Sequence, residues 1–238
     1  MTIDEAKNKI ILALDLDSIQ EVNKWADLLS QKVGMFKVGK QLFTASGPEA
    51  VRAIQKKGGK VFLDLKYHDI PNTVSMASLE AARLGVSLLN VHALGGFEMM
   101  AKTMEVLDKE FKGKREAKVL AVTILTSSTN ETLREIGIEH SVENMVVRLA
   151  KLAKKAGVDG VVASPKEVKL IREACGKDFL IVTPGVRPAF SSLNDQKRIM
   201  TPSEAIKSGV DYIVIGRPIT EAKDPVMALD SIIGEMMN

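Results

Sequence analysis

The sequence predicts an α/β fold in which eight β-strands alternate with α-helices and close into a (βα)8 barrel. Three observations support this fold class: short apolar segments recur along the chain, amphipathic segments lie between them, and the composition is 45% hydrophobic but only 4% aromatic. A core of Ile, Val, Leu, Ala and Met is typical of parallel sheets. Eight strand–helix repeats close naturally into the architecture known as the TIM barrel.

The predicted strands are short β-rich runs that recur in both halves of the chain. They cover residues 10–15, 35–39, 60–66, 88–93, 118–125, 160–164, 179–185 and 211–217. Amphipathic helices are predicted at 19–32, 48–57, 71–84, 97–110, 142–156 and 165–175, several followed by glycine (Gly58, Gly85, Gly157 and Gly176). No linker or change of composition divides the chain, so we expect one domain, residues 1–238.

Two stretches lack clear periodicity, residues 126–140 and 184–200. Both follow predicted strands, so they should lie on the catalytic face of a barrel. An open, doubly wound sheet is the alternative fold. A dinucleotide-binding sheet would carry GxGxxG after its first strand, whereas IILALD is followed here by LDSIQE.

Composition and charge exclude several classes of protein. The net charge is +3 without a dense basic run, which argues against nucleic-acid binding. The longest apolar runs are too short to cross a bilayer and the first residues are charged, so we expect a soluble, cytoplasmic protein without a membrane partner. The single cysteine, Cys175, cannot form an intramolecular disulfide and is expected to be a packed, inert thiol.

Charged side chains occur at the ends of the first three predicted strands. Asp15 ends the first strand, Lys37 interrupts the second, and Asp64 and Lys66 end the third. Side chains alternate along a strand, so Asp64 and Lys66 should point to the same side and Leu65 toward the helices. A buried structural ion pair would explain an isolated Asp-x-Lys equally well.

Together, these two aspartates and two lysines form an alternating charge set, which favours a chemical role. Such a set can keep each lysine protonated and aimed. Carboxylates repel an anionic group placed beside them, and an ammonium stabilises negative charge developing on carbon. Decarboxylation fits these requirements. Metal binding does not, because the lysines would compete with a divalent cation for the carboxylates.

A possible phosphate site follows the last strand, where Gly216 and Arg217 place a backbone amide beside a guanidinium. An ordinary surface arginine is the alternative. Arg187 and Gln196 lie in a polar stretch that could close over an anion, or that could simply be a solvated loop. The Walker lysine and Ser/Thr are missing after Gly95 and Gly96, so no triphosphate site is expected.

Other polar residues have two interpretations each. Thr126 and Ser127 could read the edge of a base or cap a turn. Asp69, before Ile70 and Pro71, could be reactive or could cap the next helix. His92 could act as an acid or base, but an imidazole hydrogen-bonded for structure is favoured.

Eight motifs carry a resemblance to a known family. In chain order they are LALD, FKVG, DLKYHDIPNT, NVHALGG, TILTSS, VTPGVRP, NDQKR and VIGRPIT. Their order and spacing over nearly the whole chain resemble the bacterial type of the orotidine 5'-phosphate decarboxylase family. The resemblance implies a (βα)8 barrel that decarboxylates orotidine 5'-phosphate to UMP without cofactor or metal.

The resemblance also implies catalytic roles. Lys66 would protonate C6 of the product carbanion, and Asp64 would lie beside the departing carboxylate. Lys37 and Asp69 would complete the charge network, while Asp15 and Lys37 would hold the ribose.

Further roles implied by the resemblance concern substrate binding and assembly. Asp69, Ile70 and Thr73 would reach into the site of a neighbouring subunit, so that the active unit is a homodimer with shared sites. The remaining substrate-binding residues would be Thr126 and Ser127 at the pyrimidine, Pro184 beside the substrate, and Arg187, Gln196, Gly216 and Arg217 at the phosphate.

Two other functions compete with this interpretation. A magnesium-dependent sibling, a hexulose-phosphate synthase or keto-gulonate-phosphate decarboxylase, would use a similar barrel and the same D-x-K-x-x-D motif. A barrel that only sequesters nucleotides would explain Gly216 and Arg217, but not the charges on the first three strands.

Overall fold

The computed structural model describes residues 1–188 and 200–237. Its strands are β1 (Ile10–Leu14), β2 (Met35–Gly39), β3 (Val61–Tyr67), β4 (Leu88–His92), β5 (Lys118–Val122), β6 (Gly160–Val162), β7 (Leu180–Pro184) and β8 (Tyr212–Ile215). Each strand pairs in parallel with the next, and β8 pairs with β1 through Ile10↔Ile213 and Ile11↔Val214. The sheet is therefore a closed barrel, which confirms the predicted fold class.

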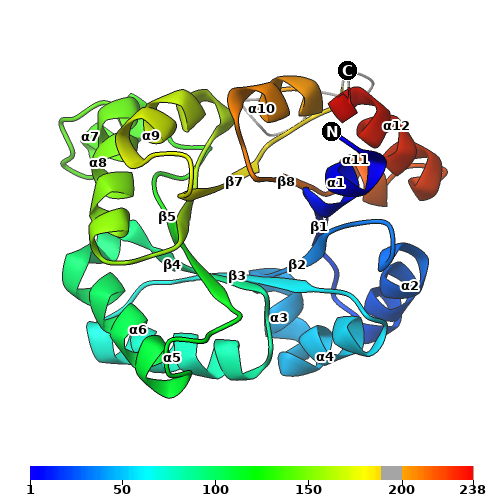
Figure 1. Ribbon diagram of the computed structural model, residues 1–238, viewed down its shortest axis with the longest axis horizontal. Helices are drawn as coiled ribbons and strands as arrows, with labels where there is room; N and C mark the ends of the chain where they lie inside the picture. Colours follow the sequence, from blue (N-terminus) through cyan, green and yellow to red (C-terminus); the bar gives the residue numbers. More distant parts are fainter. Residues whose placement is uncertain (189–199, 238) are drawn as a thin grey trace.

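The helices form a ring outside the strands (Figure 1). They are α1 (Ile3–Asn8), α2 (Ile19–Leu29), α3 (Lys40–Ser46), α4 (Pro48–Lys56), α5 (Pro71–Arg83), α6 (Gly96–Glu110), α7 (Asn130–Glu135), α8 (Val142–Lys155), α9 (Val168–Cys175), α10 (Pro202–Ser208), α11 (Arg217–Thr220) and α12 (Pro225–Met237), with 3-10 turns η1 (Ala93–Gly95) and η2 (Pro165–Glu167). All six amphipathic helices named from the sequence are present. Gly58, Gly85, Gly157 and Gly176 follow four of them with positive φ angles.

Two apolar layers hold the barrel together. Alternate strand residues such as Phe62, Leu88 and Val182 point inward and fill the interior. Their neighbours, including Leu63, Leu89 and Ile181, face outward and pack against the helices. The aliphatic composition therefore supplies both sides of every strand, as expected for a parallel sheet covered by helices.

The loop after β5 differs from its prediction. Strand β5 ends at Val122 instead of 125, and the aperiodic stretch 126–140 contains the short helix α7. Thr129 caps that helix through a reciprocal capping box with Thr132, and Leu133 is its one buried residue. A helix of six residues with one buried side chain is too short to show a hydrophobic period.

Other bulk expectations can be compared with the described residues. Cys175 is buried at the end of α9, and burial raises the pKa of its thiol, as expected for an inert packed cysteine. Within residues 1–188 and 200–237, no helix has the length and apolar character of a membrane span.

Candidate active site

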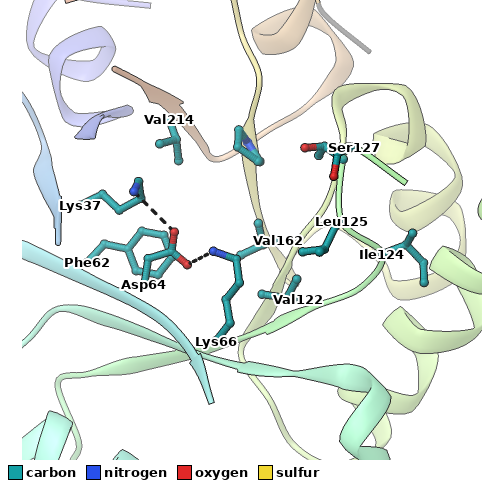
Figure 2. A pocket seen from close by; sticks show the side chains of 12 residues that line it. Lys37, Phe62, Asp64, Lys66, Val122, Ile124, Leu125, Ser127, Val162 and Val214 are labelled. Carbon is teal, nitrogen blue, oxygen red and sulfur yellow. Dashed lines mark hydrogen bonds and ion pairs between the residues drawn. The ribbon is translucent and has the colours of Figure 1, made fainter. Parts of the chain in front are cut away.

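The carboxyl ends of β1, β2 and β3 bring four charged side chains together. Lys37 Nζ lies 3.4 Å from Asp15 Oδ1 and 3.7 Å from Asp64 Oδ2. Lys66 Nζ donates to Asp64 Oδ1 at 2.6 Å. Figure 2 shows Lys37 and Lys66 approaching Asp64 from opposite sides. The predicted alternating charge set is therefore present in space, in the order Asp15, Lys37, Asp64, Lys66.

The local backbone of β3 differs from a regular strand. Leu63 pairs with Leu89 and Tyr67 pairs with Val91, so the three residues from Asp64 to Lys66 face the single residue Asn90 of β4. Lys66 also has a φ of 53°, in the left-handed region. That conformation costs a non-glycine residue roughly 1–2 kcal/mol. This bulge, and not simple alternation alone, aims Lys66 into the barrel mouth.

Asn90 is a site residue that was not predicted from the sequence. It is fully buried, its Nδ2 donates to Asp64 Oδ1 at 2.7 Å, and its Oδ1 accepts from the backbone N–H of Lys66 at 2.7 Å. The available signal was an amide in the middle of the apolar run LLNVH, where a barrel strand should be apolar.

The environment of Asp64 determines its protonation. Burial raises the pKa of this carboxyl, but the ammonium groups of Lys37 and Lys66 and hydrogen bonds from Lys66 and Asn90 lower it, and the balance lies below the usual value. Asp64 is therefore a carboxylate at neutral pH. Removing either lysine would leave a poorly compensated buried charge, which typically costs about 3–5 kcal/mol.

Gly39, at the end of β2, makes room for the ammonium of Lys37. A Cβ at this position would lie 2.9 Å from Lys37 Nζ and 3.7 Å from Asp15 Oδ1. A larger residue would push Lys37 away from its two carboxylates. The glycine of the FKVG motif is therefore required sterically, because only a residue without a side chain leaves space for the Lys37 ammonium.

A cavity of about 220 Å³ opens beside the charge network (Figure 2). Lys37, Asp64 and Lys66 lie on one side of it, and the predicted Thr126, Ser127 and Pro184 also line it. Its other lining residues are apolar: Phe62, Val122, Ile124, Leu125, Val162 and Val214. The cavity thus combines a charged wall with a mostly apolar wall, and a flat ring carrying a carboxylate could contact both.

The predicted phosphate-binding residues lie after β7 and β8. Gly216 precedes α11, and a Cβ there would lie 3.2 Å from Ala13 Cβ and 4.0 Å from Asp15 Oδ2. Arg217 is the first residue of α11. Arg187 is buried and donates to Val186 O at 3.3 Å, and it is not among the residues that line the 220 Å³ cavity. Gln196, together with most of the stretch 184–200, lies outside the described residues.

Asp69, Ile70 and Thr73 are not brought to the charge network within this chain. All three are exposed, and Ile70 is 66% exposed. Asp69 Oδ1 accepts from the backbone N–H of Ile70 at 2.6 Å. Among the described residues, no hydrogen bond or ion pair joins Asp69 to Lys37, Asp64 or Lys66.

His92 lies at the end of β4 and stacks on His68, with ring centroids 5.3 Å apart and an interplanar angle of 20°. Its Nδ1 accepts from the backbone N–H of Leu94 at 3.4 Å. Burial, followed by the positive charges of His68, Lys66 and Lys40, lowers the pKa of His92 to about 4. These contacts favour the structural interpretation, and the stacking partner His68 carried no signal in the sequence.

Within the described part of the chain, no group of three or more His, Cys, Asp or Glu residues is arranged to hold a metal ion. Both oxygens of Asp64 already face ammonium groups. A divalent cation would have to displace at least one of these lysines to reach this carboxylate.

Comparisons with known proteins identify the family of this chain. The family model of the Orotidine 5'-phosphate decarboxylase / HUMPS family matches residues 8–232. Relatives named orotidine 5'-phosphate decarboxylase from Geobacter metallireducens and Geobacter sulfurreducens are 70% and 71% identical over 237 residues, 100% of this chain and 99% of each relative. A crystal structure of orotidine 5'-phosphate decarboxylase from Lactobacillus acidophilus is similar with a TM-score of 0.84 and 41% identity, covering 96% of this chain and 99% of that one. The chain therefore belongs to the orotidine 5'-phosphate decarboxylase / HUMPS family.

Proposed function

We propose that this protein decarboxylates orotidine 5'-phosphate to UMP in pyrimidine biosynthesis, without a metal or cofactor. The observation that carries the proposal is the Asp15–Lys37–Asp64–Lys66 network, of which Lys37, Asp64 and Lys66 line one wall of the cavity. Family membership and the names of relatives at about 70% identity support the same activity. Residues 1–238 would act as one catalytic domain, in the cytoplasm.

The proposed chemistry uses Asp64 and Lys66 directly. With the substrate carboxylate beside Asp64, the two anions repel each other, and the repulsion ends when the carboxylate leaves as carbon dioxide. The electron pair of the broken bond stays on C6, where the Lys66 ammonium stabilises it and then donates a proton. Lys66 becomes a neutral amine and regains a proton from water. Lys37 and Asp69, the latter from a second subunit as proposed below, would complete an alternating series of positive and negative charges around Asp64 and Lys66.

The proposed binding roles concern three parts of the substrate: the pyrimidine, the ribose and the phosphate. Thr126 and Ser127 would hydrogen-bond the pyrimidine, with Pro184 beside it. Asp15 and Lys37 would hold the ribose hydroxyls. Gly216, Arg217, Arg187 and Gln196 would bind the phosphate, remote from the chemistry, so that its binding energy supports catalysis at C6.

The magnesium-dependent sibling activity is the alternative enzyme function. It is disfavoured because Lys37 and Lys66 already pair with the two carboxylate oxygens of Asp64. A magnesium ion that stabilises an enediolate would need such oxygens as ligands. Loss of orotidine 5'-phosphate absorbance should therefore continue unchanged in excess chelator. Abolition by chelator, with recovery on adding magnesium, would contradict the proposal and favour the sibling activity.

We further propose a homodimer with shared active sites. Asp69, Ile70 and Thr73 support it, because they are exposed shortly after Lys66 in the chain, and among the described residues no hydrogen bond or ion pair joins Asp69 to the charge network. The same region exposes further apolar side chains near the starts of the packed helices α5 and α6, including Met76 (45%) and Phe97 (42%). A second copy would cover them.

Mixing two inactive variants tests the shared site. Asp69→Ala and Lys66→Ala chains should each be inactive alone, whereas a heterodimer would hold one site with both residues intact. After complete exchange in an equal mixture, about a quarter of the sites should be functional. Exchange would be followed with two different affinity tags. Demonstrated exchange without recovered activity would contradict the shared site.

A further inference from the structure

Asn90 occupies an unusual position in the barrel. It is the single β4 residue opposite the three-residue bulge of β3, and it is fully buried. In a regular parallel pair, the Lys66 backbone N–H would donate to a carbonyl of the neighbouring strand. Here it donates to the side chain of Asn90 at 2.7 Å. The amide therefore replaces a ladder hydrogen bond at the one point where β3 leaves its register.

The two contacts of Asn90 require opposite chemistry. A backbone N–H can only donate, and the Asp64 carboxylate can only accept, so the bridging group needs an acceptor and a donor side by side. A primary amide has this pair. Aspartate in its place would set a carboxylate against Asp64, and serine would be too short to reach both atoms at once.

The shared oxygen gives Asn90 a role during the reaction. Asp64 Oδ1 accepts from Lys66 Nζ at 2.6 Å and from Asn90 Nδ2 at 2.7 Å. When Lys66 gives its proton to C6, its amine becomes a weaker donor to this oxygen. The Asn90 N–H continues to hold Asp64 in place, while its Oδ1 holds the backbone of Lys66.

We infer that Asn90 is a positioning residue for the decarboxylation: its amide couples the Asp64 carboxylate to the left-handed backbone of Lys66 and so fixes the proton donor relative to the site of charge development. The inference rests on the proposed function. It requires the Asn90 amide to act through Asp64 and Lys66, without touching the substrate.

Two variants test it, measured as kcat, KM, UMP binding and the pH profile of kcat/KM per folded molecule. Asn90→Asp keeps the shape but places two carboxylates together. It should lower kcat about 10- to 100-fold and move the acidic limb of the profile to higher pH. Asn90→Ser should lower kcat about tenfold and move that limb less, because it removes the amide that lowers the pKa of Asp64 without adding a second carboxylate. UMP should bind both variants within about threefold of the parent, because Asn90 is proposed to act through Asp64 and Lys66 without touching the nucleotide.

Thr103→Val is the matched control. Thr103 is also fully buried and hydrogen-bonded, to Met99 O at 2.9 Å within α6, and it is not part of the charge network. The control should lower thermal stability while kcat and the pH profile stay at parental values. Asn90 variants that behave like the control would overturn the inference. If neither Asn90 variant folds, the residue has a structural role and the inference is also overturned. A parent chain that does not consume orotidine 5'-phosphate would instead refute the proposed function.

Discussion

The two sides of the barrel mouth differ in their chemistry. On the side of β1 to β4, Asp15, Lys37, Asp64 and Lys66 alternate in charge, and Asn90 supports the last two. On the side of β5 to β8, the cavity wall consists of aliphatic side chains such as Val122, Val162 and Val214, followed by hydroxyls on the loop after β5. The side chains of the charged side form ion pairs with one another, whereas those of the other side are apolar or hydroxyl-bearing and define the shape of the cavity.

This difference separates chemistry from binding. In the proposed mechanism, Asp64 and Lys66 on the first side act on the group that changes during the reaction, so their removal should reduce kcat. Under the same proposal, apolar and hydroxyl groups on the second side, and Arg217 after β8, would contact parts of the substrate that do not change. They should mainly affect binding and the closure that binding drives. Variants on each side can break or sharpen this comparison.

The largest effect is expected for Lys66→Ala, on the charged side. It removes the proposed proton donor, so kcat should fall about 10³-fold or more, while UMP should still bind within about tenfold of the parent. Lys60→Ala is the control, because Lys60 is an exposed lysine immediately before β3, at the opposite end of the same strand. Near-parental turnover by Lys66→Ala would remove this lysine from the mechanism.

A smaller effect on a different parameter is expected for Arg217→Ala, after β8. Loss of the proposed charge-assisted contact to phosphate should reduce kcat/KM about 100-fold, with a raised KM and weaker UMP binding. Steady-state kinetics and UMP titration would measure this. Arg52→Ala, which removes an exposed arginine on α4, should leave both values unchanged. If Arg217→Ala changed kcat alone and left UMP binding intact, the proposed division between the two sides would be wrong.

The smallest effect concerns stability and His92 on the charged side. Burial and neighbouring positive charges lower the pKa of His92 from 6.5 to about 4, so below pH 6.5 the unfolded chain takes up a proton that the folded chain does not. Stability should therefore fall as the pH drops from 6.5 toward 4, by about 2 kcal/mol from this group after a discount for solvent screening of the partly exposed ring. Denaturant unfolding of His92→Gln should show a weaker loss over this range.

The exposed His140 offers a control, and His140→Gln should retain the parental pH dependence. An equal loss of stability in His92→Gln and in the parent would show that other groups account for the acid sensitivity.

Much of the fold could be predicted, because each strand and helix is encoded by neighbouring residues. Alternating apolar runs and amphipathic segments placed all eight strands within a few residues. The helices α2, α4, α5, α6, α8 and α9 were found by their 3.6-residue period, whereas the 13-residue α12 was not predicted. Short elements such as α7 were missed because a single buried residue does not produce a period. The end of β5 was predicted too late because Thr123 and Ile124 stay buried beyond the strand.

The charged members of the site were also predictable, since Asp64 and Lys66 are costly intrusions into an apolar pattern. The same rule applied to Asn90 would have marked it, but an amide in a strand is a weaker signal than a charge. The positive φ of Lys66 left no trace in the sequence, because nothing local to a lysine encodes that conformation. The space that Gly39 leaves for Lys37 likewise depends on a neighbour in three dimensions.

The sequence by itself therefore determined the alternation of elements, the closed barrel and the charged residues at the strand ends, because these depend on patterns among residues close in the chain. Only the tertiary structure decided how Asp64 and Lys66 are held. The bulge on β3 and the Asn90 amide on β4 meet across a strand pair, and the bonded partners are 24 and 26 positions apart in the sequence. The hydrogen bonds that aim the proposed proton donor depend on strand register, which is established only when the barrel closes.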